Sequence, residues 1–500
     1  MSKMMRSLIQ AFSYLLRPTA NRFERAVRSP QRSQSKIQQR LVNQLKRCEY
    51  GEKYKITSVE DWHKLPIVNY EDIAPWTARS QAHPNILTSE KILFYEPTSG
   101  SSGPKKQIPY TVSLRRSFNH LFCIWAYDLI KNGPVFSRGK IYFSITPSFS
   151  KVENSTGTTD DSDYLDPWLR WTLKPFLVIV PAAKTPEDFQ EKLAKTLLIA
   201  EDLEIVSIWS PSFLTAQLTY IQENQVRLHK LLKGELSEAR SHLLTQASIS
   251  WEKLWPQLKL ISCWDSMTAA DSAQSLRSHF PHTLVQGKGL LATEAPMTVP
   301  LVGANGYVPL LEDIYFEFED MAGQCHLLHQ LEIGQTYEVI ISQLGGLYRY
   351  RIGDTVRVTH YFLQTPCLEF CGRSSVSDLV GEKLSVQFVS DTLASMNLSE
   401  AHFQSLLPVQ RPEAHYVLLL DRTSRDLVVI AQTLEKHLCE SFHYRLARQL
   451  NQLAPARVVV SASAAETLMR EKVQAGQRMG DIKYEKLSRC YENLAFLTDA

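Results

Sequence analysis

The stretch "YEPTSGSSGPKKQIPYT", residues 95–111, holds two glycines, four Ser/Thr hydroxyls and two lysines between Thr98 and Lys106. The residues before this loop, "KILFYEP", are typical of a β-strand, and those from Ile108 onward turn into an apolar-periodic helix. A glycine- and hydroxyl-rich loop between a strand and a helix lets backbone N–H groups face a phosphate, and lysines add positive charge. A flexible Ser/Gly linker has a similar composition, but the flanking elements favour an anion-binding loop.

The loop matches neither of two well-known catalytic patterns. It lacks the G-x-x-x-x-G-K-[ST] pattern of a Walker A loop. Neither Ser101 nor Ser102 has glycines both two residues before it and two residues after it, as a G-x-S-x-G nucleophile elbow requires. The loop by itself therefore predicts a phosphate site, most simply for a nucleotide.

Length and composition indicate a globular protein of several domains. Its 500 residues exceed one ordinary core, so two or three domains are expected. Hydrophobic residues at 44% and charged residues at 21% are typical of soluble proteins, and a net charge of +3 does not indicate a nucleic-acid partner. No apolar run approaches the ~20 residues of a membrane helix, so no integral membrane association is expected.

The eight cysteines are scattered and form no C-x-x-C pair. Cys367 and Cys371 are close in sequence, but no matching Cys/His pair nearby completes a zinc site. Free thiols in a reducing cytosol are the simplest interpretation, which predicts a cytoplasmic location.

The first 23 residues contain no Asp or Glu, and their apolar side chains from Met5 to Leu16 fall on one helical face. This pattern is found in organellar presequences and in surface-seeking helices. It is also the pattern of an ordinary first helix packed on the body of the protein, which is the interpretation we favour.

The order of elements along the chain predicts an α/β fold. Residues 1–50 read as helices, and from about residue 90 strands such as "KIYFSIT", "PFLVIVPAA" and "WPQLKLISCW" alternate with helices such as Pro186 to Ala200. The chain is β-rich from about residue 306. From about residue 372 a small α+β unit holds "AHYVLLLDR", "DLVVIAQT", a helix near residues 434–452 and "ARVVVSAS". We therefore expect a large multi-layer N-terminal domain, residues 1–371, with a β-rich portion, and a small mobile C-terminal domain, residues 372–500.

The segment "VQGKGLLATEAPMTVP" contains a loose G-x-G-x-x-A dinucleotide fingerprint. That fingerprint needs a helix directly after it, and Pro296 and Pro300 forbid one. The segment is better interpreted as a strand ending in Thr293-Glu294. A carboxylate at a strand end beside a phosphate loop is a natural Mg²⁺ ligand, although a solvated loop glutamate would have the same sequence.

Three later segments carry further candidate residues. In "LYRYRIGDTVRV", Asp354 is expected on a Gly-Asp turn between two strands, where it either accepts hydrogen bonds from a ribose diol or only forms the turn. The segment "FCGRSSVSDLVGEKLS", with Arg373 and Lys383, places glycines beside polar residues at a domain junction and suits a hinge. The late loop "GQRMGDIKYEKLSR" carries Lys483 and taken alone reads as a charged surface tail.

The order of these pieces resembles an adenylate-forming enzyme, and more closely the GH3 family of acyl acid amido synthetases in its bacterial branch. The pieces are "TSGSSG…K", "LLATE", "YRYRIGD", "GR…GEK" and a late lysine loop. The segments "KLPIVNYEDIAPW", "IWSPSFL", "WPQLKLISCW" and "QGKGLLATEAPMTVPL" are also similar to that family, so the resemblance spans most of residues 40–390. The C-terminal quarter matches more weakly.

The resemblance implies the adenylate-forming fold and a reaction in two steps. ATP and a carboxylic acid first form an acyl-adenylate and pyrophosphate on the large domain. The small domain then swings, and an amine, usually an amino acid, attacks the acyl carbon to form an amide. The implied ligands are ATP and Mg²⁺, and the implied substrates are a carboxylic acid and an amine.

The resemblance also implies roles for single residues. It assigns binding of the α-phosphate and the metal to Thr293 and Glu294, and binding of the ribose to Asp354. It places Arg373 and Lys383 at the hinge side of the nucleotide, and it assigns catalysis of adenylation to Lys483 together with Lys106 and Glu294. The residues that it assigns to the phosphates are Thr98, Ser99, Gly100, Ser101, Ser102, Gly103 and Lys106. Lys486 is an alternative to Lys483. The chain departs from the wider superfamily at Leu290, where many members have a tyrosine, and at Ser374-Ser375, where a hinge aspartate usually follows "GR".

Three functions from different classes stay open at this point. The first is an acyl acid amido synthetase, and the second is an acyl-CoA ligase that shares the first half-reaction. The third is a non-catalytic descendant that binds acyl acids or a nucleotide. Intact Glu294, Asp354 and a late lysine argue against the third.

Overall fold

The structure is a computed structural model of the chain. It describes residues 2–97, 106–143, 167–320, 322–373, 376–377, 379, 382, 384–449, 453–474, 482, 484–488, 491 and 494. These residues divide into two compact units, one that takes in residues 1–98 and 105–371 and a second that takes in the residues from Gly372 onward. The large unit and the small unit are described separately below.

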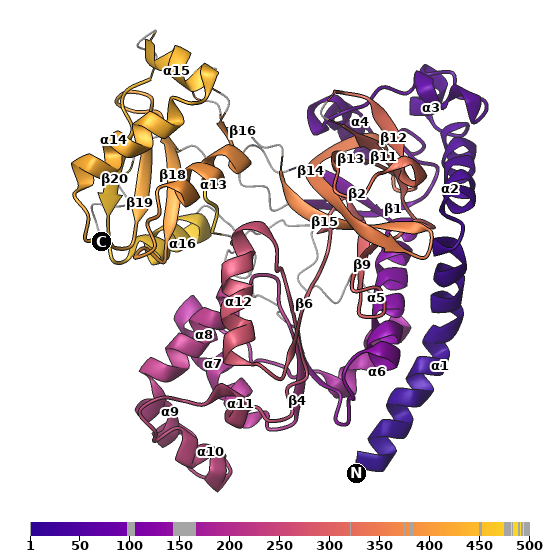
Figure 1. Cartoon of the computed structure of the whole chain (residues 1–500). Helices are drawn as coiled ribbons and strands as arrows, with labels where there is room; N and C mark the ends of the chain where they lie inside the picture. The colour runs from indigo at the N-terminus through magenta and orange to yellow at the C-terminus, as the bar shows by residue number, and fades with distance from the viewer. Residues whose placement is uncertain are drawn as a thin grey trace. The chain divides into compact units, whose positions relative to one another are not determined.

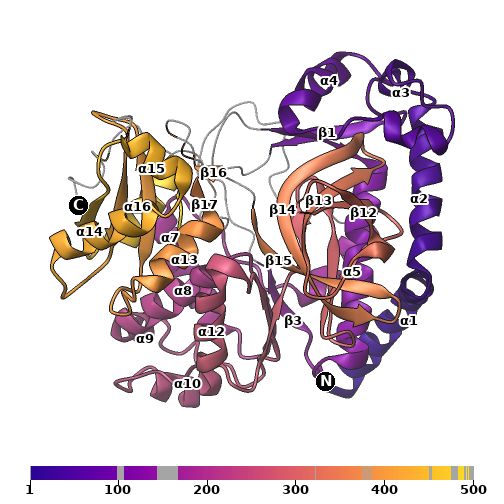
Figure 2. The same cartoon turned by 45° about the horizontal axis from the view of Figure 1, so that its top comes forward.

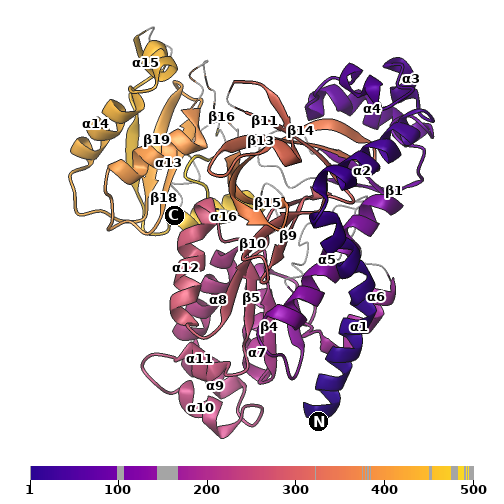
Figure 3. The same cartoon turned by 45° about the vertical axis from the view of Figure 1, so that its right-hand side comes forward.

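The large unit begins with helices, as the sequence predicts. They are α1 (Ser2–Val27), α2 (Pro30–Leu45) and α3 (Glu49–Lys53). α1 packs along α5 (Val112–Asn132) and buries Leu16, Ala20 and Phe23, so the favoured interpretation of a first helix packed on the body is the one that the structure shows (Figures 1 and 3). Among the described residues, no helix combines the length and the apolar character that a bilayer crossing needs.

A four-stranded parallel sheet forms one layer of the large unit. Its order is β3 (Lys140–Phe143), β4 (Leu203–Ser207), β5 (Leu260–Cys263) and β6 (Leu284–Gly287). Side chains alternate between the two faces, since Val206 and Ile261 join the core beneath α7 (Pro186–Ile199), α8 (Pro211–Glu223) and α12 (Ala270–His279), while Ile205 and Leu260 join the core on the side of α5. The carboxyl ends of the four strands therefore lie at one edge.

The expectation of a strand in "PFLVIVPAA" is wrong. Leu177 makes a single bridge to Ile141, and the N–H of Val178 donates to the carbonyl of Ile141 at 2.8 Å. Residues 178–183 form no strand, so the run contributes one bridge residue at the edge of β3. Val178 and Val180 instead pack against the core around α7 and α8.

A five-stranded sheet forms the β-rich portion of the large unit. Its order is β12 (Cys325–Leu327), β11 (Tyr315–Glu319), β13 (Thr336–Gln343), β14 (Leu347–Phe362) and β15 (Thr365–Arg373). β14 is long and curves strongly around the sheet (Figures 1 and 2). Two short hairpins adjoin these layers: β7 (Leu291–Ala292) with β8 (Ala295–Pro296), and β9 (Thr298–Leu301) with β10 (Gly306–Pro309).

The loop with which the sequence analysis began joins two strands. β1 (Ile92–Pro97) pairs antiparallel with β2 (Gln107–Thr111), and Pro97 faces Gln107 at the loop end of this hairpin. The expectation of a strand before the loop is correct, but that of a helix directly after it is wrong. The helix α5 starts only at Val112, because Thr111 caps it by accepting from the N–H of Leu114 at 3.3 Å.

The small unit is an α+β layer around a three-stranded sheet. β18 (Gln404–Val409) and β19 (His415–Leu420) are antiparallel, and β20 (Arg457–Val460) runs parallel to β19. The helices α13 (Val386–Ser395) and α14 (Leu427–Leu438) pack on one face, and α16 (Ala464–Gln474) packs on the other. The segment "DLVVIAQT" begins α14, because the Asp426 side chain accepts from the N–H groups of Val428 and Val429.

Candidate active site

The phosphate-loop residues Thr98 to Gly103 lie outside the described residues, and the description resumes at Lys106. The Lys106 Nζ lies 3.5 Å from the Tyr350 Oη, and 5.6 Å from the centroid of the Tyr70 ring. The next residue, Gln107, donates its N–H to the Tyr70 Oη at 2.7 Å. Lys106 is thus placed between the start of α4 (Tyr70–Ala82) and β14, and the residue is half-buried.

Thr293 and Glu294 form the two-residue connection of the β7–β8 hairpin. A strand ends just before these two residues, as expected, but the segment is not one strand: β6 ends at Gly287, and β7 belongs to a separate hairpin. Glu294 is buried, with 8% of its surface exposed, and its backbone carbonyl accepts from the Gln343 Nε2 at 3.4 Å. Gln343, itself 1% exposed, is the last residue of β13 and fixes the hairpin against the five-stranded sheet.

The expectation that Asp354 lies on a turn between two strands is wrong. Asp354 lies inside the single strand β14, which continues from Leu347 to Phe362. The pairing with β13 steps from Glu338–Thr355 to Ile340–Arg351, so β14 carries two extra residues here and forms a bulge. Gly353 adopts a φ of +83°, which a glycine can do without strain. The chain therefore bends at the bulge and does not reverse its direction. Asp354 is 5% exposed.

The β13–β14 ladder brings two of the candidate residues to one region. Tyr350, which contacts Lys106, pairs with Ile341, and Ile341 lies two residues before Gln343, which contacts Glu294. Two residues along a strand are roughly 7 Å. The contacts of Lys106 and Glu294 with the sheet are therefore close together, and Asp354 lies further along the same strand.

The candidates at the domain junction are only partly described. Arg373 ends β15, and its side chain lies outside the described atoms, as do all atoms of Lys383. Between them, Glu382 is fully buried, accepts from the N–H of Leu379 at 2.7 Å and accepts a short hydrogen bond from the Tyr416 hydroxyl. Burial, followed by the Glu382 charge, raises the pKa of Tyr416. This buried pair ties the junction segment to the small unit.

Lys483 lies outside the described residues, but both of its neighbours are anchored in the small unit. Ile482 is 4% exposed, and the Tyr484 ring packs edge-on against Phe403 at 5.5 Å. The backbone then runs beside β18, where the N–H of Leu406 donates to the carbonyl of Lys486 at 2.7 Å. The late segment is therefore an added edge of the small sheet after Lys483, with Leu487 bridged to Leu406 and Tyr491 bridged to Val409.

The sequence analysis gave no role to Lys288, which the structure places at the carboxyl edge of the parallel sheet. Its Nζ donates to the Ser207 Oγ at 2.8 Å and to the Ser262 Oγ at 3.3 Å, and it lies 5.3 Å from the centroid of the Trp209 ring. A lysine between two glycines, directly after a buried strand, is the sequence signal that could have indicated it.

Beside Lys288, a second polar group fastens the end of β6. The Tyr307 hydroxyl donates to the Asp265 Oδ1 at 2.7 Å, and the Arg277 Nη2 lies 3.3 Å from the Asp265 Oδ2. Burial and then the Asp265 charge raise the pKa of Tyr307, so its hydroxyl stays a proton donor. This group joins the loop after β5 to β10 and α12.

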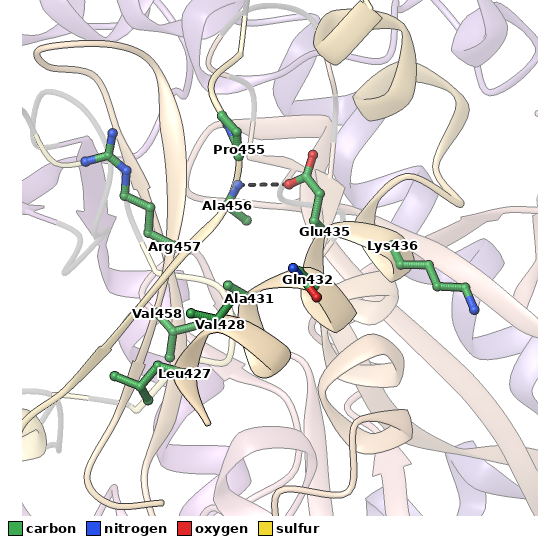
Figure 4. A pocket seen from close by; sticks show the side chains of 10 residues that line it. All are labelled: Leu427, Val428, Ala431, Gln432, Glu435, Lys436, Pro455, Ala456, Arg457 and Val458. Atoms are coloured by element: carbon green, nitrogen blue, oxygen red, sulfur yellow. Dashed lines mark hydrogen bonds between the residues drawn. The ribbon is translucent and has the colours of Figure 1, made fainter. Parts of the chain in front are cut away.

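The small unit also has a recess, between α14 and β20 (Figure 4). The Glu435 carboxylate lies at its wall and accepts from the N–H of Ala456 at 2.8 Å, while Leu427 and Val428 give an apolar surface. None of the candidate residues lines this recess.

The described residues contain no cluster of three or more His, Cys, Asp or Glu side chains that could hold a metal ion by themselves. A Mg²⁺ ion usually takes one or two protein carboxylates and completes its shell with water and substrate phosphates. Glu294, a buried residue on the turn of the β7–β8 hairpin, could supply one such carboxylate, which fits that kind of site and not an all-protein cage.

Comparisons with known proteins agree along most of the chain. Residues 19–285 match the GH3 family N-terminal domain, residues 307–373 the GH3 family central domain, and residues 385–492 the GH3 family C-terminal domain. The indole-3-acetic acid-amido synthetase GH3.2 of Arabidopsis thaliana is 23% identical over 81% of this chain and 86% of its own. The indole-3-acetic acid-amido synthetase GH3.4 of the same species is 22% identical, over 93% of this chain and 90% of its own.

Solved structures show the same fold. The acyl acid amido synthetase AtGH3.15, in complex with 2,4-DB, superposes with a TM-score of 0.79 at 19% identity, covering 97% of this chain and 95% of that one. A 2-hydroxyisobutyryl-CoA ligase in its postadenylation state superposes with a TM-score of 0.53 at 14% identity. The superposition covers 93% of this chain and 90% of the ligase chain. The expected fold, with a larger N-terminal and a smaller C-terminal part, is confirmed.

Proposed function

The chain belongs to the GH3 family, and we propose that it is an ATP-dependent acyl acid amido synthetase. The observation that carries the proposal is the match to all three GH3 domains, over residues 19–285, 307–373 and 385–492, which takes in both units. The curated relatives at 22–23% identity are named as amido synthetases, and they align with most of this chain. The prediction of the family from the sequence is confirmed; its bacterial branch stays a prediction.

The first step is the formation of an acyl-adenylate. A carboxylate oxygen of the acid attacks the α-phosphorus of ATP, the bond from that phosphorus to the β-phosphate bridging oxygen breaks, and pyrophosphate leaves. No protein nucleophile is needed, so the protein contributes position and charge. The Ser/Gly loop from Thr98 to Gly103 and the Lys106 ammonium are proposed to hold the phosphates.

Mg²⁺ is proposed to be held by Glu294 together with the phosphates of ATP. When bound, the ion neutralises negative charge on the phosphates. The turn residue Thr293 is placed beside this carboxylate, and a short hydroxyl side chain suits a contact with the α-phosphate. The hydrogen bond from Gln343 to the Glu294 backbone carbonyl supports this assignment, because it holds the turn that carries the carboxylate.

The remaining nucleotide contacts are proposed for Asp354, Arg373 and Lys383. Asp354 would accept hydrogen bonds from the ribose diol from its place in the β14 bulge. Arg373 and Lys383 flank the junction between the two units and would contact the nucleotide from the hinge side. Lys483 would approach the α-phosphate while adenylation takes place.

The second step is the formation of the amide. The nitrogen of the amine attacks the acyl carbon, the bond from that carbon to the phosphate oxygen breaks, AMP leaves, and the amine loses a proton. The small unit is proposed to rotate between the two steps, which would remove Lys483 and admit the amine. We take the amine to be an amino acid.

The first prediction is Mg²⁺-dependent, carboxylate-dependent exchange of pyrophosphate into ATP. Acids are screened by trapping the activated acyl group with hydroxylamine. For each positive acid, the products with free amino acids and with coenzyme A are then compared. Amide formation in preference to thioester supports the proposal, whereas thioester formation indicates an acyl-CoA ligase. Absence of exchange with a broad panel of aryl and aliphatic acids would identify a non-catalytic descendant.

A further inference from the structure

Lys288 stands at the carboxyl edge of the parallel sheet, where the fold gathers residues from three separate strands. Ser207 ends β4, Ser262 lies in β5 and Lys288 follows β6 directly. The two serines are 81 and 26 residues from Lys288 in sequence, and both are nearly buried, at 5% and 2% exposed. Their hydroxyls hold the ammonium at a defined place, because both accept a hydrogen bond from the same Nζ.

These serines belong to a polar row that crosses the sheet. Ser207 pairs with Ser262, and Ser262 pairs with Gln286, so the three side chains point to the same face. That face looks toward α5, since the Trp125 Nε1 of α5 donates to the Gln286 Oε1 at 2.8 Å. Neighbouring positions of the same strands, such as Ile205 and Leu260, contribute to the apolar core. A polar row at the carboxyl end of an otherwise apolar layer is typical of a ligand site in α/β folds.

Two indoles stand next to the ammonium. Lys288 lies over the Trp209 ring, and the rings of Trp209 and Trp264 are 5.7 Å apart at 42°. Both tryptophans follow the ends of parallel strands, β4 and β5, and their backbones are joined by a hydrogen bond of 2.8 Å. The flat indole surfaces suit packing against an aromatic ring, and the ammonium beside them suits a carboxylate on that ring.

We infer that Lys288 positions the carboxylate of the acyl acid, and that the acid has an aromatic body that packs beside Trp209 and Trp264. The inference rests on the proposed function, because it specifies the substrate class of that reaction. Lys288 precedes the Thr293–Glu294 turn by only a few residues, on the same segment. The lysine acts on binding and orientation of the acid, and takes no part in bond making.

The experiment compares wild type with Lys288→Met, Lys288→Arg and the control Lys140→Met. Lys140 is a half-buried lysine of the same sheet that donates to the Pro175 carbonyl at 3.1 Å, at the amino end of β3. The probes are benzoate, phenylacetate, indole-3-acetate and the aliphatic hexanoate, with benzamide and indole-3-acetamide as neutral counterparts. Binding is measured by calorimetry without ATP, and KM values for acid and for ATP are measured by pyrophosphate exchange.

We expect Lys288→Met to raise Kd and KM for the aromatic acids by about tenfold or more, as for loss of a charge-assisted hydrogen bond. KM for ATP should stay within about twofold, Lys288→Arg should recover part of the loss, and Lys140→Met should behave as wild type. Wild type should bind the carboxylates more tightly than their amides, and Lys288→Met should lose that preference. A merely structural lysine would not change the preference for carboxylate over amide.

The failures of the two proposals are distinguishable. Lys288-dependent binding of aromatic acids without any exchange would contradict the proposed function and leave this inference standing. Exchange that is equally efficient in Lys288→Met would overturn this inference alone. It is also overturned if the substitution raises KM for ATP instead, which would place the ammonium at a phosphate. Absence of binding of any probe to wild type, or tighter binding of hexanoate than of the aromatic acids, would overturn it as well.

Discussion

At the scale of single residues, Asp354 shows how a buried charge and an irregular backbone coincide. The residue is 5% exposed, in a bulge that Gly353 makes possible with a φ of +83°. Burial of a carboxylate is costly unless hydrogen bonds compensate it, and bulges often redirect a side chain next to an active site. β14 stays paired with β13 on both sides of the bulge, with the register shifted by two residues across it. This supports a ligand-binding role better than a turn would have done.

The second prediction concerns Asp354→Ala. If Asp354 holds the ribose diol, the change should raise KM for ATP ten- to a hundredfold, because a charge-assisted hydrogen bond contributes roughly 1.5–3 kcal/mol. KM for the acid should stay nearly constant. The measurement is pyrophosphate exchange with varied ATP, after thermal unfolding has confirmed a folded protein.

Asp320→Ala provides the control for Asp354. Asp320 follows β11 in the same sheet and accepts from the N–H groups of Ala322 and Gln324, both at 2.9 Å, in a surface turn. Its loss should affect stability without changing KM for ATP. If Asp354→Ala also leaves KM for ATP unchanged, its carboxylate belongs to the structure of the bulge, and the ribose is held elsewhere.

At the scale of elements, the end of β6 shows how a glycine can set the position of a site. A Cβ on Gly287 would overlap the Tyr307 hydroxyl and the Asp265 carboxylate, which are hydrogen-bonded to each other at 2.7 Å. Gly287 therefore lets β6 end against this pair, and the next residue is Lys288. The lysine and the Thr293–Glu294 turn both depend on this close approach, because they continue the same segment.

The third prediction is that Gly287→Ala lowers the free energy of unfolding and weakens acid binding. Overpacking a filled site costs about 1–3 kcal/mol, and the displaced strand end would move Lys288 away from Ser207 and Ser262. Chemical denaturation measures the first effect, and KM for the acid measures the second. Removal of the overlapping hydroxyl, by adding Tyr307→Phe, should recover part of both losses.

Gly334→Ala is the matched control for Gly287. Gly334 has a φ of +85°, but nothing lies within 4 Å of an added Cβ. Its cost should be limited to the left-handed backbone conformation, roughly 1–2 kcal/mol, with no effect on KM. A Gly287→Ala protein with unchanged stability and unchanged KM would show that the strand end yields easily and does not position the lysine.

At the scale of the whole molecule, the chain consists of two units with separate cores. Leu406, Leu418 and Leu434 belong to a cluster confined to the small unit, and that unit therefore has what an independently moving body needs. The late segment is fastened to this unit at Ile482, Tyr484 and Lys486. Any rotation of the small unit would therefore carry the segment around Lys483 with it.

The fourth prediction uses Lys483→Ala to test whether this lysine of the small unit acts only in the adenylation step. A lysine that stabilises charge at the α-phosphate only during adenylation should contribute on the order of a thousandfold, about 4 kcal/mol of transition-state stabilisation. Adenylation should slow accordingly, while amide formation from a pre-made acyl-adenylate should be nearly unchanged. Single-turnover assays of the two half-reactions give the comparison, and a folding defect would slow both.

Lys486→Ala is the companion variant. If it shows the selective loss and Lys483→Ala does not, the mechanism stands with a different lysine. If neither variant affects adenylation selectively, the late segment has only a structural role at the edge of β18, and catalysis by a moving lysine is refuted.

The sequence alone determined the features that depend on neighbours in the chain. The helix α7 follows from Thr185 as its cap and Pro186 at its first position, and the buried strands follow from short apolar runs such as "LISC". The family, too, was predicted from the order of short motifs along the chain. The strand end at Thr293–Glu294 was also predicted, because Pro296 and Pro300 exclude a helix after it.

Only the tertiary structure decided the features that depend on distant partners. "RIGDTV" suits a turn or a bulge equally well, and the pairing with β13 is what holds β14 in one strand through Asp354. The apolar run near Leu177 makes a single bridge to Ile141, and its residues Val178 and Val180 pack against the core around α7 and α8. Lys288 acquires its place from Ser207 and Ser262, 81 and 26 residues away, whose positions are set by the packing of parallel strands. Local pattern cannot encode such a site, because its geometry exists only after the sheet has formed.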